Sequence, residues 1–188
     1  MDKQISTSRR AFLRVTALGA AAAALPFRLQ ADRNQKEVPI ALKGKSSFTM
    51  WQIPSHEDDI GNSYVFRTHK GRLVVMDGGM PVESMFLRGF LGAMGGEVEA
   101  WFISHPHGDH MGALNQILAD TQDLHIRHIY HSRMPEAVIK GAPQSEADCR
   151  EFYARLEAAK DITVTDLQEP GDTFSWDGMN LQILGVAN

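Results

Sequence analysis

Apolar residues recur along this chain with two periods, and the alternation predicts strands separated by helices after an antiparallel start. The predicted strands cover residues 47–53, 62–68, 72–77, 98–103, 124–132, 162–165, 173–176 and 179–184. The predicted helices cover residues 82–94, 108–121 and 145–159, where apolar residues are spaced three or four apart. This order predicts an α/β sandwich in which the helices lie outside the sheet.

Turn-forming residues set the boundaries of these elements. Gly95-Gly96 ends the first helix, whose apolar side includes Met85. Asp177-Gly178 between two apolar runs predicts a hairpin. Residues 133–144 are predicted to be a loop, and Ser145 is predicted to cap the helix that follows.

A dense group of potential metal ligands follows an apolar predicted strand. The run is Ser104-His105-Pro106-His107-Gly108-Asp109-His110. In extended backbone, side chains two apart point the same way, so His105 and His107 can converge on one cation. Asp109 and His110 would return to the same space from the first turn of the helix. Three imidazoles and one carboxylate suit zinc, with manganese or iron possible. The carboxyl end of a strand is also where open α/β sheets place ligands.

These residues give the chain a family resemblance over residues 47–188. It resembles the metallo-β-lactamase-fold hydrolases, whose signature is His-x-His-x-Asp-His. The matching residues are His105, His107, Asp109 and His110. The resemblance implies a four-layer αββα sandwich. It also implies one metal held with help from the first two histidines and a second held by the Asp-His pair, hence two zinc ions per intact protein. Asp77-Gly78-Gly79 looks most like the branch that contains the metallo-β-lactamase-like domain of DNA-uptake competence proteins.

The same resemblance implies further metal ligands from a second half of the fold. No convincing position for them follows His131, and residues 166–188 contain no histidine. We therefore expect residues 47–188 to be the N-terminal part of a metallo-β-lactamase-like domain that is incomplete at its C-terminus. The alternative is a chain that departs from the family and holds metal poorly.

Three residues outside the signature are weaker candidates for the site. Asp77 closes an apolar strand, where a carboxylate is costly to bury without partners. By resemblance it would orient a metal-binding histidine or the loop that carries it, and the alternative is a turn aspartate bonded to local amides. His56 lies in an acidic loop that is either solvated or at the rim of the site. His131, at the carboxyl end of a predicted strand, is a second candidate for that rim.

The N-terminus indicates an exported protein. Ser8-Arg9-Arg10-Ala11-Phe12 resembles a twin-arginine signal, and the Ala-rich stretch at 11–25 is too short to span a bilayer comfortably. We expect a signal peptide at 1–31, a linker at 32–46 and no stable membrane span after cleavage. The bacterial twin-arginine export machinery would be a partner, and the destination periplasmic or extracellular. The alternatives are an ordinary amphipathic helix or an uncleaved anchor.

Charge changes this picture once the leader is set aside. Residues 32–188 hold 14 basic and 22 acidic side chains, a formal charge of −8. Such a surface disfavours a nucleic acid and favours a small-molecule substrate. The single Cys149 excludes an internal disulfide and lies on an apolar helical stripe, so we expect it to be a core residue.

Together these features favour a metal-dependent hydrolase for the intact protein. A zinc-activated water would attack an ester, lactone, amide or phosphodiester bond, and Asp109 would orient or deprotonate that water. An iron-dependent oxidoreductase of the same fold and a non-catalytic metal-binding module are the two alternatives.

Overall fold

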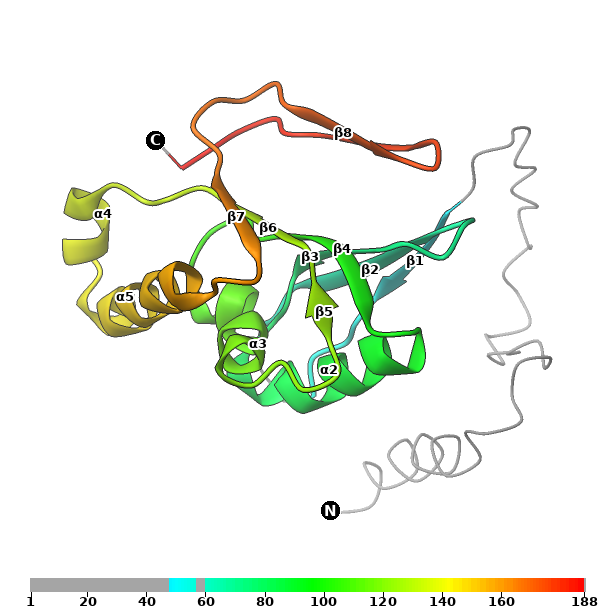
Figure 1. Ribbon diagram of the computed structural model, residues 1–188. Coiled ribbons are helices and arrows are strands. Elements are labelled where there is room, and N and C mark those ends of the chain that lie inside the picture. Colours follow the sequence, from blue (N-terminus) through cyan, green and yellow to red (C-terminus); the bar gives the residue numbers. More distant parts are fainter. Residues whose placement is uncertain (1–47, 57–59, 188) are drawn as a thin grey trace, which may run out of the picture. The chain divides into compact units, whose positions relative to one another are not determined.

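The computed structural model describes residues 48–56 and 60–187 (Figure 1). The predicted signal peptide at 1–31, the predicted linker at 32–46 and the acidic residues 57–59 lie outside the described residues. Contacts divide the chain into residues 1–41 and 42–188, and every described residue belongs to the second unit. Among the described helices, none has the length and apolar character needed to cross a membrane.

A seven-stranded sheet forms the centre of this unit, in the order β1-β2-β3-β4-β6-β7, with β5 also paired to β4 (Figure 1). The strands β1, β2 and β3 pair antiparallel, and the pairs from β3 to β7 are parallel. These strands are β1 (Phe48–Gln52), β2 (Ser63–Thr68), β3 (Leu73–Asp77), β4 (Glu97–Phe102), β5 (His125–Ile126), β6 (His128–His131) and β7 (Thr163–Asp166). The predicted antiparallel start is confirmed.

Parallel neighbours need crossover connections, and the helices supply them. The helices are η1 (Pro81–Glu83, 3-10), α2 (Ser84–Ala93), α3 (Gly108–Ala119), α4 (Glu136–Lys140) and α5 (Pro143–Ala158). Their apolar sides pack with one face of the sheet into the larger core, in which Trp101, Phe152 and Leu87 are fully buried. The α/β class predicted from the sequence is therefore confirmed.

A two-stranded sheet covers part of the opposite face. It consists of β8 (Thr173–Trp176) and β9 (Met179–Gln182), joined by the predicted Asp177-Gly178 turn. Both turn residues have positive φ, as this tight hairpin requires. Phe174 and Trp176 pack against Phe102 of the large sheet, and Thr68 Oγ donates to Asp177 Oδ2 at 2.7 Å. The described layers are thus helices, large sheet and hairpin.

A bulge in β4 decides which side chains face the helices. The register pairs Leu73 with Val98 but Val74 with Ala100, so Glu99 is the extra residue. After it, Trp101 and Ile103 face the helical layer, while Ala100 and Phe102 face the hairpin. The Glu99 side chain is held by Arg72 at 2.8 Å.

Several predicted boundaries were wrong. The strand predicted at 124–132 is broken at Arg127, which allows Ile126 and Ile129 both to enter the larger core. The predicted loop at 133–144 contains α4, and α5 begins at Pro143 instead of being capped by Ser145. Proline suits a first helical position because its missing N–H would have no partner there. Met85 is 81% exposed, because α2 buries Leu87 and Leu91 instead.

Candidate metal centre

His105 and His107 lie in the turn between β4 and α3, and Asp109 and His110 lie in the first turn of α3, at the edge of the sheet where the parallel strands end. His107 is extended, with φ −96° and ψ 153°, and the helix begins at Gly108. The Cys149 thiol of α5 donates to the carbonyl of Pro106 at 2.9 Å, so the turn is also held from the helical side. Burial raises the pKa of that thiol, which agrees with the core role predicted for Cys149.

The turn brings the four candidate ligands into one cluster, called here the signature cluster: His105, His107, Asp109 and His110. The ring centroids of His105 and His107 are 4.6 Å apart, and those of His105 and His110 are 3.9 Å apart. His110 Nε2 lies 3.2 Å from Asp109 Oδ2. The spacing argument from the sequence placed these side chains together, and the structure does so.

Asp77 lies beneath the signature cluster at the end of β3. Its side chain is buried and accepts three hydrogen bonds, from the Ser104 amide at 2.8 Å, the Ser104 hydroxyl at 3.0 Å and His110 Nδ1 at 2.8 Å. An ionised carboxylate can only accept, so Nδ1 of His110 donates to Asp77, while Nε2 faces Asp109 Oδ2.

The charge state of His105 also suits a ligand. Burial lowers the pKa of this imidazole, and the neighbouring His110 and His107 lower it further. Asp77 and Asp109 act in the opposite direction without cancelling the shift. A neutral imidazole is the form that binds a metal ion.

The kind of donors fits a divalent metal such as zinc, but the side chains are not assembled into a finished site. Two ligands of one tetrahedral zinc lie about 3.3 Å apart, which is close to the 3.2 Å between His110 Nε2 and Asp109 Oδ2. Across residues 48–56 and 60–187, however, no three His, Cys, Asp or Glu side chains are arranged to hold one ion. Side-chain rotation, or ligands outside these residues, would be needed to complete the coordination.

Backbone contacts fix the position of the first turn of α3. The Gly78 amide donates to the carbonyl of His110 at 2.6 Å, and the Asn62 amide donates to that of Asp109 at 3.0 Å. A Cβ at Gly112 would lie only 2.5 Å from Pro81 Cδ, so a glycine is required for this close approach of α3 to η1. The first turn of α3 is therefore held by the residue before β2 and by the connection between β3 and α2.

Comparison with known proteins now decides the family. The sequence model of the metallo-beta-lactamase superfamily matches residues 56–184, which include the whole signature. The chain belongs to this superfamily. Members of the superfamily are generally metal-dependent hydrolases and typically bind metal ions such as zinc.

One solved structure shows how far the likeness extends. It is a crystal structure of a candidate metallo-beta-lactamase from Thermotoga maritima, with 14% sequence identity and a TM-score of 0.36. The match covers 68% of this chain and 62% of the Thermotoga maritima chain. This chain therefore spans less than two thirds of the length of that protein. A search of curated protein sequences gave no match.

Within the described residues, neither of the two other predicted histidines contacts the signature cluster. His56 binds Glu83, and no hydrogen bond or ring contact within the described residues joins it to the cluster. His131 is buried between β6 and α5, against the rings of Phe152 and Tyr153. Its Nδ1 has no hydrogen-bond partner within the described residues. A place at the rim stays a prediction for both.

Sequence reasoning did not single out Ser104 or Glu83. Ser104 directly precedes His105, so its position at the end of β4 was a usable clue. Its hydroxyl also lies 3.1 Å from both His105 Nδ1 and His110 Nδ1. Glu83 gave no such clue. Its side chain is buried, but the sequence of an amphipathic helix does not show whether a glutamate is buried or solvated until its partners are known.

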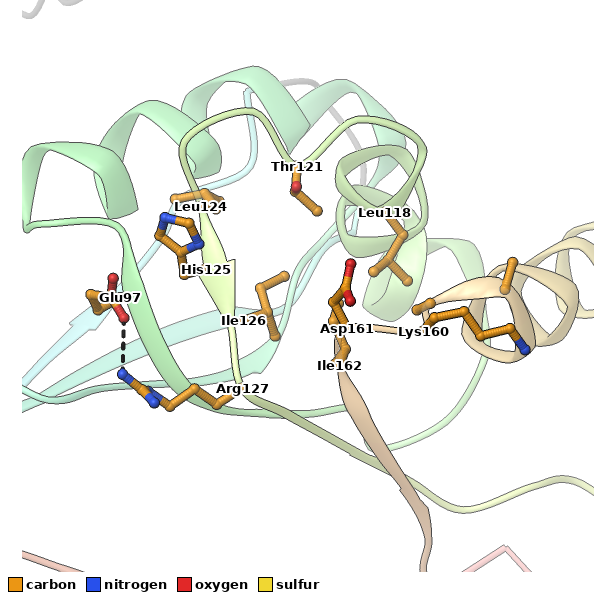
Figure 2. Close-up of a pocket in the computed structure, with 12 residues that line it drawn as sticks. Glu97, Leu118, Thr121, Leu124, His125, Ile126, Arg127, Lys160, Asp161 and Ile162 are labelled. Atoms are coloured by element: carbon orange, nitrogen blue, oxygen red, sulfur yellow. Dashed lines mark hydrogen bonds and ion pairs between the residues drawn. The ribbon is translucent and has the colours of Figure 1, made fainter.

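A cavity of about 760 Å³ lies at the other edge of the sheet (Figure 2). Its lining comes from the amino ends of β4, β5 and β7 and the carboxyl ends of α3 and α5. Figure 2 shows apolar side chains such as Leu118 and Ile162 beside charged ones such as Lys160 and the Arg127–Glu97 ion pair. It contains no residue of the signature cluster. Because α/β sheets bind ligands at the carboxyl edge, we place the site at the cluster and not here.

Proposed function

We propose that this chain carries metal ligands of a zinc-dependent hydrolase site. The observation that carries the proposal is the signature cluster, in which four donors of the right kind meet at the carboxyl edge of the sheet. His105 and His107 would help to hold one ion, and Asp109 and His110 a second. The contact of Asp77 with His110 Nδ1 supports a role in orienting that ligand.

The residues of the cluster divide the chemistry among them. A bound divalent cation would polarise the bond under attack and lower the pKa of a water. Asp109, half-buried beside His110, would orient that water and accept its proton. The three histidines would bind the cations through their ring nitrogens. The bond is an ester, lactone, amide or phosphodiester of a small molecule, since the acidic surface opposes a nucleic acid.

The test is hydrolysis by the wild-type chain and His107→Ala, each loaded with zinc. Four chromogenic probes cover the bond classes: p-nitrophenyl acetate, a thiolactone with thiol detection, a p-nitroanilide and bis(p-nitrophenyl) phosphate. We expect the wild-type chain to hydrolyse at least one probe and the variant to lose most of that activity. His69→Gln is the matched control, because His69 lies in an exposed turn. Equal activity in His107→Ala would refute the assignment.

We also propose export through the twin-arginine machinery, supported by Arg9-Arg10 ahead of the Ala-rich stretch. A fusion of residues 1–31 to a reporter that is active only after folded export tests this in a bacterium. Arg9→Lys with Arg10→Lys should abolish export. The Asp77-Gly78-Gly79 turn supports a place in the competence-like branch of the superfamily.

A further inference from the structure

A second histidine of this protein is held by a buried carboxylate in the same manner as His110. Glu83 is 2% exposed, and its two oxygens are both engaged. Its Oε1 accepts from the Ser55 hydroxyl at 3.1 Å and from the His56 amide at 2.8 Å. Its Oε2 contacts His56 Nδ1. The two pairs, Asp77–His110 and Glu83–His56, thus share one construction.

This contact fixes which nitrogen of His56 is available. The Glu83 carboxylate only accepts, so Nδ1 carries a proton and Nε2 is the free position. Among the described residues, Nε2 has no hydrogen-bond partner, and 37% of the side chain is exposed. The ring also packs against Phe86, with centroids 4.5 Å apart. His56 is therefore an oriented imidazole that presents one unused nitrogen.

The pair lies at the same edge of the sheet as the signature cluster. Ser63, at the start of β2, pairs with Asp77, at the end of β3, so the residues just before β2 and the end of β3 share that edge. The loop ends at Asn62, whose amide donates to the carbonyl of Asp109 at 3.0 Å. On the other side, the Glu83 side chain lies so close to Gly79 that a Cβ there would be 3.2 Å from Glu83 Cγ.

We propose that His56 is the proton donor to the leaving group of the hydrolysed substrate, and that Glu83 is its positioning residue. This inference rests on the proposed hydrolase function. A water oxygen bonds to the acyl or phosphoryl centre, and its proton goes to Asp109. His56 acts as an imidazolium ion, with a proton on each ring nitrogen. The bond to the leaving oxygen breaks, the electron pair stays on that oxygen, and the Nε2 proton moves to it. The neutral ring then keeps the Nδ1 proton that it donates to Glu83. His56 then regains a proton from solvent, which reaches its exposed side.

Leaving-group dependence separates this role from a structural one. An ethoxide leaving group needs a proton, whereas p-nitrophenolate leaves without one. General acid catalysis contributes roughly 10²–10⁴-fold, so His56→Gln should lower kcat/KM for ethyl acetate by about that factor. The same variant should change kcat/KM for p-nitrophenyl acetate by no more than about three-fold. If the wild-type chain acts on phosphodiesters instead, methyl p-nitrophenyl phosphate and dimethyl phosphate replace the two esters.

Glu83→Gln should also lower kcat/KM for ethyl acetate more than kcat/KM for p-nitrophenyl acetate, but by a smaller factor than His56→Gln. The reason is that the amide of glutamine holds the His56 ring less firmly than the carboxylate does. His69→Gln should leave both rates unchanged. Two measurements do not depend on activity. NMR signals of the His56 ring nitrogens are assigned by their absence in His56→Gln. In the wild-type chain, these signals should show that Nδ1 is protonated. The zinc content of His56→Gln should equal that of the wild-type chain.

The possible outcomes are distinct. If the wild-type chain hydrolyses none of the probes, the proposed function fails and this inference fails with it. If the wild-type chain is active and His56→Gln slows both leaving groups equally, or neither, only the role of His56 is overturned. Loss of zinc from His56→Gln would make His56 a metal ligand instead of a proton donor. A wild-type His56 with its proton on Nε2 alone would also overturn the proposal.

Discussion

At the scale of single residues, Asp77 shows how a carboxylate can be retained in a buried and strained position. Its φ is +57°, a region that non-glycine residues rarely adopt, and its side chain is 4% exposed. Three hydrogen bonds from Ser104 and His110 compensate for both costs. Strain of this kind is found at functional sites, where the surroundings hold a residue in one geometry.

Replacing Asp77 by asparagine tests this role directly. Asparagine tolerates positive φ, and its side-chain oxygen can still accept from the Ser104 amide. Its NH₂ group then takes the place of the oxygen that accepts from His110, and an NH₂ group cannot accept a hydrogen bond. We expect the zinc affinity of the cluster to fall roughly 10–100-fold, measured by competition with a chromogenic chelator. Asp120→Asn at the exposed end of α3 is the control. An unchanged affinity in Asp77→Asn would mean that Asp77 serves only the fold.

His131 provides a prediction about pH. Burial lowers the pKa of this side chain, Asp166 opposes that shift and Arg133 adds to it. The unfolded chain therefore binds a proton at a higher pH than the native chain does. Stability from the neutral, buried ring is fully present above about pH 6.5 and is lost as the pH falls toward the lowered native pKa.

We expect the free energy of unfolding to fall below about pH 6.5 by at most about 1.4 kcal/mol per pH unit from this one group. Urea titrations between pH 7.5 and 5 measure it. His131→Gln should flatten that dependence, whereas His69→Gln, at an exposed turn, should not. A pH dependence unchanged by His131→Gln would show that other groups cause it.

At the scale of elements, the β4–α3 unit carries the signature cluster, and its neighbours set its position. The turn after β3 holds the start of α3 through Gly78, and η1 lies directly against Gly112. The spacing of the ligands thus depends on how closely two elements approach, and not only on the signature itself.

Gly112→Ala should separate these elements. The added Cβ would lie 2.5 Å from Pro81 Cδ and 2.7 Å from Pro81 N, so α3 or η1 must move. We expect a loss of about 1–3 kcal/mol in the free energy of unfolding, measured by urea denaturation. Gly89→Ala is the matched control, since nothing lies within 4 Å of its added Cβ in α2. Equal stability of the two variants would contradict the close packing described here.

Local patterns were sufficient to predict most of the elements and the closeness of the four signature side chains, because strand and helix periods and ligand spacing are properties of short segments. They could not predict the bulge at Glu99 or the break at Arg127, since both arise from pairing with distant strands. Glu83 was missed for the same reason. Its partners Ser55 and His56 lie 28 and 27 residues away and meet it only in the folded sheet edge.

At the scale of the whole described unit, the order of the sheet explains why the candidate site residues gather at one edge. His56 follows β1, Asp77 ends β3 and the signature cluster follows β4, so all of them lie at the carboxyl edge of the parallel strands. The cavity at the opposite edge lacks such a cluster (Figure 2). Membership of the superfamily agrees with this arrangement, because its signature lies within the matched residues 56–184.

The most direct test of the central claim is the metal content of the chain itself. The wild-type chain and His107→Ala, both without a histidine tag, are equilibrated with zinc, desalted and measured by elemental analysis. The account predicts stoichiometric zinc, at least one ion per wild-type chain, and a clear loss in His107→Ala with the fold retained by circular dichroism. The same zinc content in both proteins, or none in either, would contradict it.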